Sequence, residues 1–201
     1  QGFWMRLGVW CGVATNEENN PEDIMINNAH YVFFDLETTG ISPLAHEIIE
    51  IGAVDFVNGN VGKTFQRFVK PSVQISEQTT ELTGITQADV ENAPSLKEII
   101  PEFLKYIEGK VLVAHNAEFD LTFLNAHLRR LGYNEIKNTV IDTLKLSWVL
   151  NKTLRNHRLG TVARNEGVQY NEVSAHRADY DAIILQQVYE NMILKLSDEY
   201  N

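Results

Sequence analysis

The sequence has 201 residues, of which 44% are hydrophobic and 22% are charged, proportions that are ordinary for one folded domain with a buried core. No run of about eighteen or more apolar residues occurs, so no membrane-spanning helix is predicted. The net charge of −10 at pH 7 argues against tight binding of duplex nucleic acid through a basic surface. It does not exclude an enzyme that binds divalent cations, because bound ions neutralise the carboxylates around them.

Residues 1–29 differ from the rest of the chain, because an apolar start is followed by a polar stretch without periodicity. We predict a lead-in segment, linker or tag there, a domain over residues 30–197 and a tail at 198–201; the alternative for the lead-in is an ordinary first strand and loop. No clear secretory cleavage site is present, and Cys11, the single cysteine, cannot form an internal disulfide. Both features favour a cytoplasmic protein. The lead-in, and an end soon after the last predicted helix, favour a piece of a longer polypeptide.

Three strands are predicted at the start of the domain. The segment 31–38, YVFFDLET, is rich in β-formers, and the segments 47–57 and 62–70 flank an Asn58-Gly59-Asn60 turn. An Asn-Gly pair between two such runs is a strong hairpin signal. The pattern therefore predicts three strands in antiparallel meander order.

Helices and short strands alternate after this meander. Gly84, Gly109 and Gly132 each follow a segment with helical spacing and are expected to end it. The further predicted strands are 111–115 and 140–143, and the predicted helices are 76–83, 95–107, 118–131, 143–150, 159–166 and 179–196. The fold class is therefore α/β, with a mixed five-stranded sheet and helices on both faces.

Acidic residues fall at the ends of three of these elements. Asp35 and Glu37 are two apart on the first strand, so their side chains share one face and repel each other unless a cation neutralises them. Asp120 lies in the first turn of a helix that follows a buried strand, a common ligand position in α/β sheets. Each has a plainer alternative: a solvated polar pair at a strand end, or a charge that complements the helix dipole.

The third cluster opens the last helix. Asp181 shares a helix face with Leu185, which points it toward the core, where an acid needs a partner. His176 is best placed on the preceding loop, and histidine can accept a proton near neutral pH. Four carboxylates and one mobile histidine together favour a hydrolytic site with two divalent cations, in which one ion activates water and the other steadies the leaving oxygen.

Three motifs carry a resemblance to a known family: Asp35-x-Glu37, His115-Asn116-x-x-Phe119-Asp120 and His176-x-x-x-x-Asp181. In this order they resemble the DEDDh (DnaQ-like) exonucleases, over residues 31–195. The sequence is most similar to the proofreading domain of PolC-type DNA polymerase III, with the ε-type proofreading subunit second. This resemblance implies the ribonuclease H-like exonuclease fold, two Mg²⁺ or Mn²⁺ ions, and removal of nucleotides from a single-stranded or frayed DNA 3′ end.

The resemblance also implies a role for each matching position. Asp35, Glu37, Asp120 and Asp181 would hold the metal ions, and His176 would deprotonate the attacking water. The residues that would contact the terminal nucleotides are Thr38, Thr39, Gly40, Asn116 and Phe119. The related subgroup has tyrosine at the position of this histidine. It is disfavoured, because Tyr180 directly precedes Asp181 and cannot occupy the position of His176. Asp142 is interpreted as a helix cap or supporting residue.

Two further points stay open from the sequence. A basic cluster at Lys152, Arg155, His157 and Arg158 is either a solvated loop or a contact for the substrate backbone. The substrate is either DNA, with possible attachment to the rest of a DNA polymerase III, or short RNA and RNA 3′ ends, because the motifs do not read the 2′-hydroxyl. A non-catalytic module on the same fold would be favoured if one of the metal-binding residues were absent from the motifs, and none is missing.

Overall fold

A computed structural model of the protein describes residues 29–172 and 174–200. The predicted lead-in, including Cys11, lies outside these residues except for Ala29, and the division of the chain into lead-in, domain and tail stays a prediction. Within the described part of the chain, no helix combines the length and the apolar character that crossing a membrane requires.

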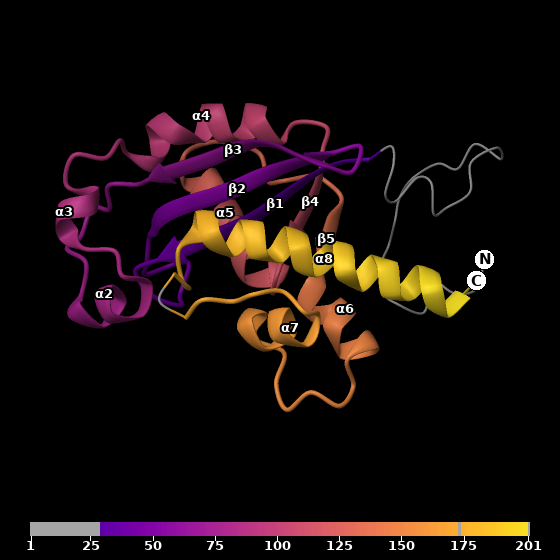
Figure 1. The fold of residues 1–201 in the computed structure, drawn as a ribbon. Helices are drawn as coiled ribbons and strands as arrows, with labels where there is room; N and C mark the ends of the chain where they lie inside the picture. Colours follow the sequence, from indigo (N-terminus) through magenta and orange to yellow (C-terminus); the bar gives the residue numbers. More distant parts are fainter. Residues whose placement is uncertain (1–28, 173, 201) are drawn as a thin grey trace.

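One mixed sheet organises the fold (Figure 1), with the strand order β3-β2-β1-β4-β5. The strands are β1 (His30–Thr38), β2 (Ile48–Val57), β3 (Asn60–Phe68), β4 (Val111–Ala114) and β5 (Val140–Asp142). β1, β2 and β3 pair antiparallel, whereas β4 pairs parallel to β1 and β5 parallel to β4. The predicted meander and mixed five-stranded sheet are therefore confirmed.

The backbone angles of the turn between β2 and β3 explain why the Asn58-Gly59 pair predicts a hairpin. Asn58 and Gly59 have φ angles of 50° and 77°. A two-residue hairpin of type I′ requires positive φ at both central positions, and asparagine and glycine tolerate it best.

The described helices match the predicted ones with one addition. They are α2 (Glu77–Thr83), α3 (Gln87–Val90), α4 (Leu96–Ile107), α5 (Ala117–Arg130), α6 (Thr143–Leu150), α7 (Leu159–Asn165) and α8 (Ala178–Tyr200). α3 was not predicted: it has four residues, too few for a helical period, and only a Thr86–Asp89 capping box marks it. α8 continues beyond the predicted end at residue 196.

Helices cover both faces of the sheet, as predicted, and each face has its own core (Figure 1). Phe33, on one side of β1, packs in a cluster with residues of α6, α7 and α8. Phe34, on the other side, packs with residues of α4 and α5. This alternation follows from the period of two along a strand. The helices packed on the two faces bring the first residues of α5 and α8 beside β1.

The start of α8 touches the sheet directly at Gly52 of β2. A Cβ atom at this position would lie 2.0 Å from the carbonyl carbon of Ala178. Gly52 pairs with Asp35 across the β1–β2 ladder, so the close approach places the beginning of α8 next to the acidic end of β1.

Gly52→Ala is expected to destabilise the protein, because the added methyl group overlaps helix backbone that cannot move without displacing α8. The expected loss in the free energy of unfolding is about 1–3 kcal/mol, measured by urea denaturation. Gly62→Ala is the matched control: Gly62 is exposed on the edge strand β3, and its added Cβ would meet only Asp55, whose Cβ lies at 3.0 Å and whose carbonyl oxygen lies at 3.5 Å. Equal losses in the two variants would contradict close packing of α8 on β2.

Candidate active site

A cleft of about 1230 Å³ opens beside the acidic end of β1. Residues from β1, α2, α5, α6, α7 and α8, together with the segments that precede α7 and α8, line this cleft. Among them are all ten residues that the sequence predicts for metal binding, catalysis or substrate binding: Asp35, Glu37, Thr38, Thr39, Gly40, Asn116, Phe119, Asp120, His176 and Asp181. Segments far apart in the sequence therefore converge on one cavity.

The carboxylates of β1 occupy the same side of the strand. Asp35 is half-buried and Glu37 is 8% exposed, whereas Leu36 between them points into the opposite core. The ladder with β2 is irregular between Glu37 and Thr38. The strand thus places two acids in the cleft just before its regular pairing ends.

Asp120 is more than a charge at a helix terminus. Asn116, with φ of 73°, ends the turn after β4, and α5 begins at Ala117. Asp120, in the first turn, is only 2% exposed, and its Oδ1 accepts a hydrogen bond of 3.2 Å from the Leu36 backbone N–H. The side chain therefore reaches across to β1 and joins its carboxylate to the pair on that strand.

His176 and Asp181 are linked around the start of α8. His176 is exposed and lies on the loop before the helix, as expected from its spacing. Its backbone N–H donates a hydrogen bond of 2.9 Å to Asp181 Oδ2. The other oxygen, Oδ1, is buried and has no hydrogen-bond partner within the described residues, a costly condition for a carboxylate unless another ligand binds there.

Three side chains of the cleft could share a metal ion. Ligand atoms of Glu37, His176 and Asp181 all lie within 4.8 Å of one another. Carboxylate oxygens are the ligands that Mg²⁺ prefers, and Mn²⁺ also accepts them. With the unpartnered Asp181 oxygen, the two carboxylates of this group fit a bound divalent cation, and His176 lies beside them.

The acids strongly disfavour ionisation in the absence of such an ion. Loss of solvent, followed by repulsion from Asp181 and Glu50, raises the pKa of Glu37 to about 9. Burial raises the pKa of Asp120 to about 8 and that of Asp181 to about 7. Although Asp35 keeps part of its surface in the cleft, desolvation and the charge of Glu37 raise its pKa well above the usual value. Divalent cations would reverse this effect by favouring the ionised carboxylates.

The loop after β1 is held by its own threonines. Thr38 Oγ1 donates a hydrogen bond of 2.7 Å to the Gly40 carbonyl. Thr39 exchanges backbone and side-chain hydrogen bonds with the backbone of Glu47, and its carbonyl accepts from Thr79 Oγ1 at 3.2 Å. These hydrogen bonds therefore fix the shape of the predicted substrate loop against the residue before β2 and against α2.

The predicted stacking residues lie at the start of α5. Asn116 is exposed at the cleft, and Phe119 is half-buried. The Phe119 ring packs against Phe123 with centroids 4.9 Å apart. Packing from behind leaves this aromatic ring fixed at the cleft wall.

The predicted basic cluster divides into two parts. His157 and Arg158 line the cleft, whereas Lys152 and Arg155 do not. The loop before α7 is tied to the residue that follows β4, because His115 hydrogen-bonds the His157 carbonyl at 2.7 Å. The other ring nitrogen of His115 hydrogen-bonds Thr143 Oγ1 of α6 at 2.9 Å. His115 is thus a satisfied supporting residue.

Two supporting acids differ in how visible they are in the sequence. Asp142 caps α6 through the Leu144 N–H and also accepts from the Asn116 N–H, in agreement with its interpretation as a cap. Sequence reasoning missed Glu50, a buried acid in β2 whose signal was an ionisable residue inside an otherwise apolar run.

Together, the mixed sheet and the acid-lined cleft define an exonuclease domain of the ribonuclease H-like fold. A family model described as Exonuclease (RNase_T) matches residues 32–189, and the chain belongs to this family. DNA polymerase III PolC-type of Ureaplasma parvum is 43% identical over 183 residues, which are 90% of this chain. The chain spans only 13% of the length of that polymerase. The predicted resemblance to PolC-type exonuclease domains is confirmed.

Solved structures agree with this assignment. Exonuclease X in complex with 5′-overhanging duplex DNA is 28% identical with a TM-score of 0.65, covering 84% of this chain and 93% of that one. The nuclease domain of 3′hExo, a DEDDh family member bound to rAMP, has a TM-score of 0.69 over 85% of this chain and 93% of that one. At 22% identity, the second likeness shows the fold alone.

The raised pKa values predict how stability depends on pH. Carboxyl groups titrate near pH 4 in an unfolded chain, and Glu37, Asp120 and Asp181 titrate at about 9, 8 and 7 here. The folded protein binds more protons in this window, so the free energy of unfolding of the metal-free protein falls as pH rises from about 5 to 9. Urea denaturation in EDTA measures this fall.

Asp181→Asn serves as the control for this prediction, because asparagine cannot ionise. The fall in stability with pH is expected to be smaller in this variant. Metal-free wild-type protein whose stability rises over the window, or an equal slope in both proteins, would contradict the raised pKa values.

Proposed function

We propose that the domain hydrolyses the terminal phosphodiester at a DNA 3′ end and releases nucleoside 5′-monophosphates, as the proofreading activity of a bacterial DNA polymerase III. The observation that carries this proposal is the convergence of acids from β1, α5 and α8, with His176, on one cleft. The similarity to a PolC-type polymerase supports DNA as the substrate.

The four carboxylates at Asp35, Glu37, Asp120 and Asp181 would hold two Mg²⁺ or Mn²⁺ ions. When bound, such ions lower the pKa of an attacking water and stabilise charge on the leaving oxygen. Because the acids come from three separate elements, the rigid sheet and the two helix starts fix their relative positions.

His176 would act as the general base. It is exposed on its loop, and its ring lies within ligand distance of Glu37 and Asp181, so it can accept a proton from water at the carboxylates and pass it to solvent. The adjacent acids would stabilise the imidazolium that forms.

The remaining cleft residues suit a single-stranded end. Phe119 offers a ring to a terminal base, and exposed apolar side chains at Ile41, Leu82 and Trp148 also line the cleft. Base stacking on such groups does not depend on sequence, which is what a proofreading enzyme needs. His157 and Arg158 would contact the phosphate backbone. Association with the rest of a polymerase III and a cytoplasmic location follow from the same proposal.

Matched DNA and RNA oligonucleotides with single-stranded 3′ ends test the substrate directly. We expect shortening from the 3′ end with Mg²⁺ or Mn²⁺, release of nucleoside 5′-monophosphates, and faster hydrolysis of DNA than of RNA. Faster hydrolysis of RNA would replace the proposal with an exoribonuclease of the same family.

Asp35→Ala is expected to abolish hydrolysis of the DNA oligonucleotide while leaving the cooperative unfolding transition in place, because it removes a metal ligand rather than core volume. His176→Ala is the contrasting variant: hydrolysis slows by a factor of about 10²–10⁴, and Mn²⁺ binding, followed by calorimetry, is largely kept. Hydrolysis by Asp35→Ala at the wild-type rate would disprove the metal site, and loss of Mn²⁺ binding in His176→Ala would disprove the general-base role.

A further inference from the structure

A fully buried carboxylate lies directly behind the cleft. Glu50 is 0% exposed and stands opposite Glu37 in the β1–β2 ladder. Antiparallel partners project to the same face of a sheet, so Glu50 points toward the side on which α8 begins. It is not among the residues that line the cleft, and the proposed chemistry does not use it.

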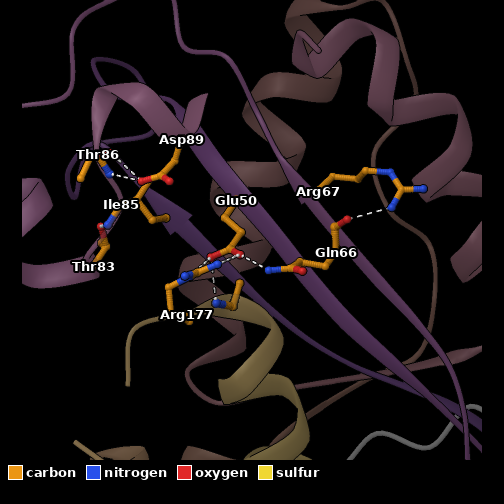
Figure 2. Close-up of polar contacts among 9 residues, drawn as sticks. Glu50, Gln66, Arg67, Thr83, Ile85, Thr86, Asp89 and Arg177 are labelled. Atoms are coloured by element: carbon orange, nitrogen blue, oxygen red, sulfur yellow. Dashed lines mark hydrogen bonds and ion pairs between the residues drawn. The ribbon is translucent and has the colours of Figure 1, made fainter. Parts of the chain in front are cut away.

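Four donors converge on this carboxylate (Figure 2). Arg177 donates from Nε to Oε2 at 3.3 Å and from Nη2 to Oε1 at 3.2 Å. The Ala178 backbone N–H donates to Oε2 at 3.1 Å, and Gln66 of β3 donates from Nε2 to Oε1 at 2.8 Å. Glu50 therefore joins β2 and β3 to the residues that directly follow His176.

The same segment is held from two other directions. The Arg177 guanidinium lies over the Phe68 ring, 5.1 Å from its centroid. The missing side chain of Gly52 allows the Ala178 backbone to rest on β2. Ala178 is the first residue of α8, and its N–H is one of the donors that a helix start leaves without an intrahelical partner.

His176 has a backbone conformation that needs such support. Its φ of 59° lies in the left-handed region, which a non-glycine residue occupies only when surrounding bonds enforce it. Asp181 Oδ2 holds the N–H of His176, and Glu50 holds the two residues after it. His176 is thus fixed on both sides by carboxylates, one inside the cleft and one behind it.

We propose that Glu50 is a positioning residue that sets the place of His176 over Glu37 and Asp181 without touching the substrate. This inference rests on the proposed role of His176 as general base. A glutamine at this position keeps the volume but leaves one acceptor oxygen for four donors, and its own amide would face an N–H group. Glu50→Gln should therefore release Arg177 and Ala178 and let His176 leave its position.

The test compares wild type, Glu50→Gln, His176→Ala and the double variant on a single-stranded DNA oligonucleotide with Mg²⁺. We expect Glu50→Gln to lower kcat about 10- to 100-fold and to change KM less than about threefold. In the His176→Ala background the same change should cost less than about twofold, because the residue that Glu50 positions is already absent.

The double variant also separates positioning from a direct electrostatic effect. The charge of Glu50 raises the pKa of Glu37, so its removal could alter metal binding by itself. Such an effect would persist without His176. An unchanged kcat in Glu50→Gln, or an equal fold-loss in both backgrounds, would overturn the proposal.

Glu166→Gln provides the matched control for general destabilisation. The Glu166 side chain is also 0% exposed and is held by Asn151 and Lys195, but it does not line the cleft. We expect Glu166→Gln to be less stable than wild type, with kcat within about twofold of the wild-type value.

Arg177→Gln is the second variant if Glu50→Gln does not fold. Arg177 is half-buried, and its substitution removes two of the four donors, so it should also lower kcat.

Backbone ¹⁵N order parameters at His176 and Ala178 provide a readout that is independent of activity. They should fall in Glu50→Gln and stay at wild-type values in Glu166→Gln. Wild-type protein that does not hydrolyse DNA would reject the proposed function, whereas unchanged order parameters in Glu50→Gln would reject the positioning role alone.

Discussion

Four carboxylates, three of them buried, line one cleft, and the repulsion between their charges governs the design of the site. Each acid comes from an element with its own reason to be there: Asp35 and Glu37 from the pleat of β1, Asp120 from the first turn of α5 and Asp181 from that of α8. Ionising all of them without cations is costly, as the raised pKa of Glu37 shows. The folding free energy of the rest of the domain must therefore hold these acids together until cations bind.

That energy comes from packing that is remote from the chemistry. Two separate cores clamp the sheet from both faces, and the cluster under α8 includes Phe33 and Leu185. Gly52 and Glu50 then bring the start of α8 onto β2, beside the acids. The histidine loop can consequently be exposed to solvent and still keep a defined position.

Sequence reasoning recovered the fold and the acids because their signals are local. The Asn58-Gly59 pair needs only its own φ angles, and the faces of Asp35 and Asp181 follow from strand and helix periods. The role of Glu50 was beyond such reasoning, because its partner Arg177 lies 127 positions away and only tertiary folding pairs them. The Thr39 hydroxyl likewise meets the Glu47 backbone only because the loop between β1 and β2 turns back on itself.

Calorimetric titration of metal-free protein with Mn²⁺ at about pH 7.5, in two buffers of different ionisation enthalpy, tests the central claim most directly. If cations make the carboxylate cluster possible, two ions bind per chain and protons are released, because Glu37 and Asp120, with pKa values of about 9 and 8, must lose theirs. Binding without proton release, or no binding at all, would contradict the account.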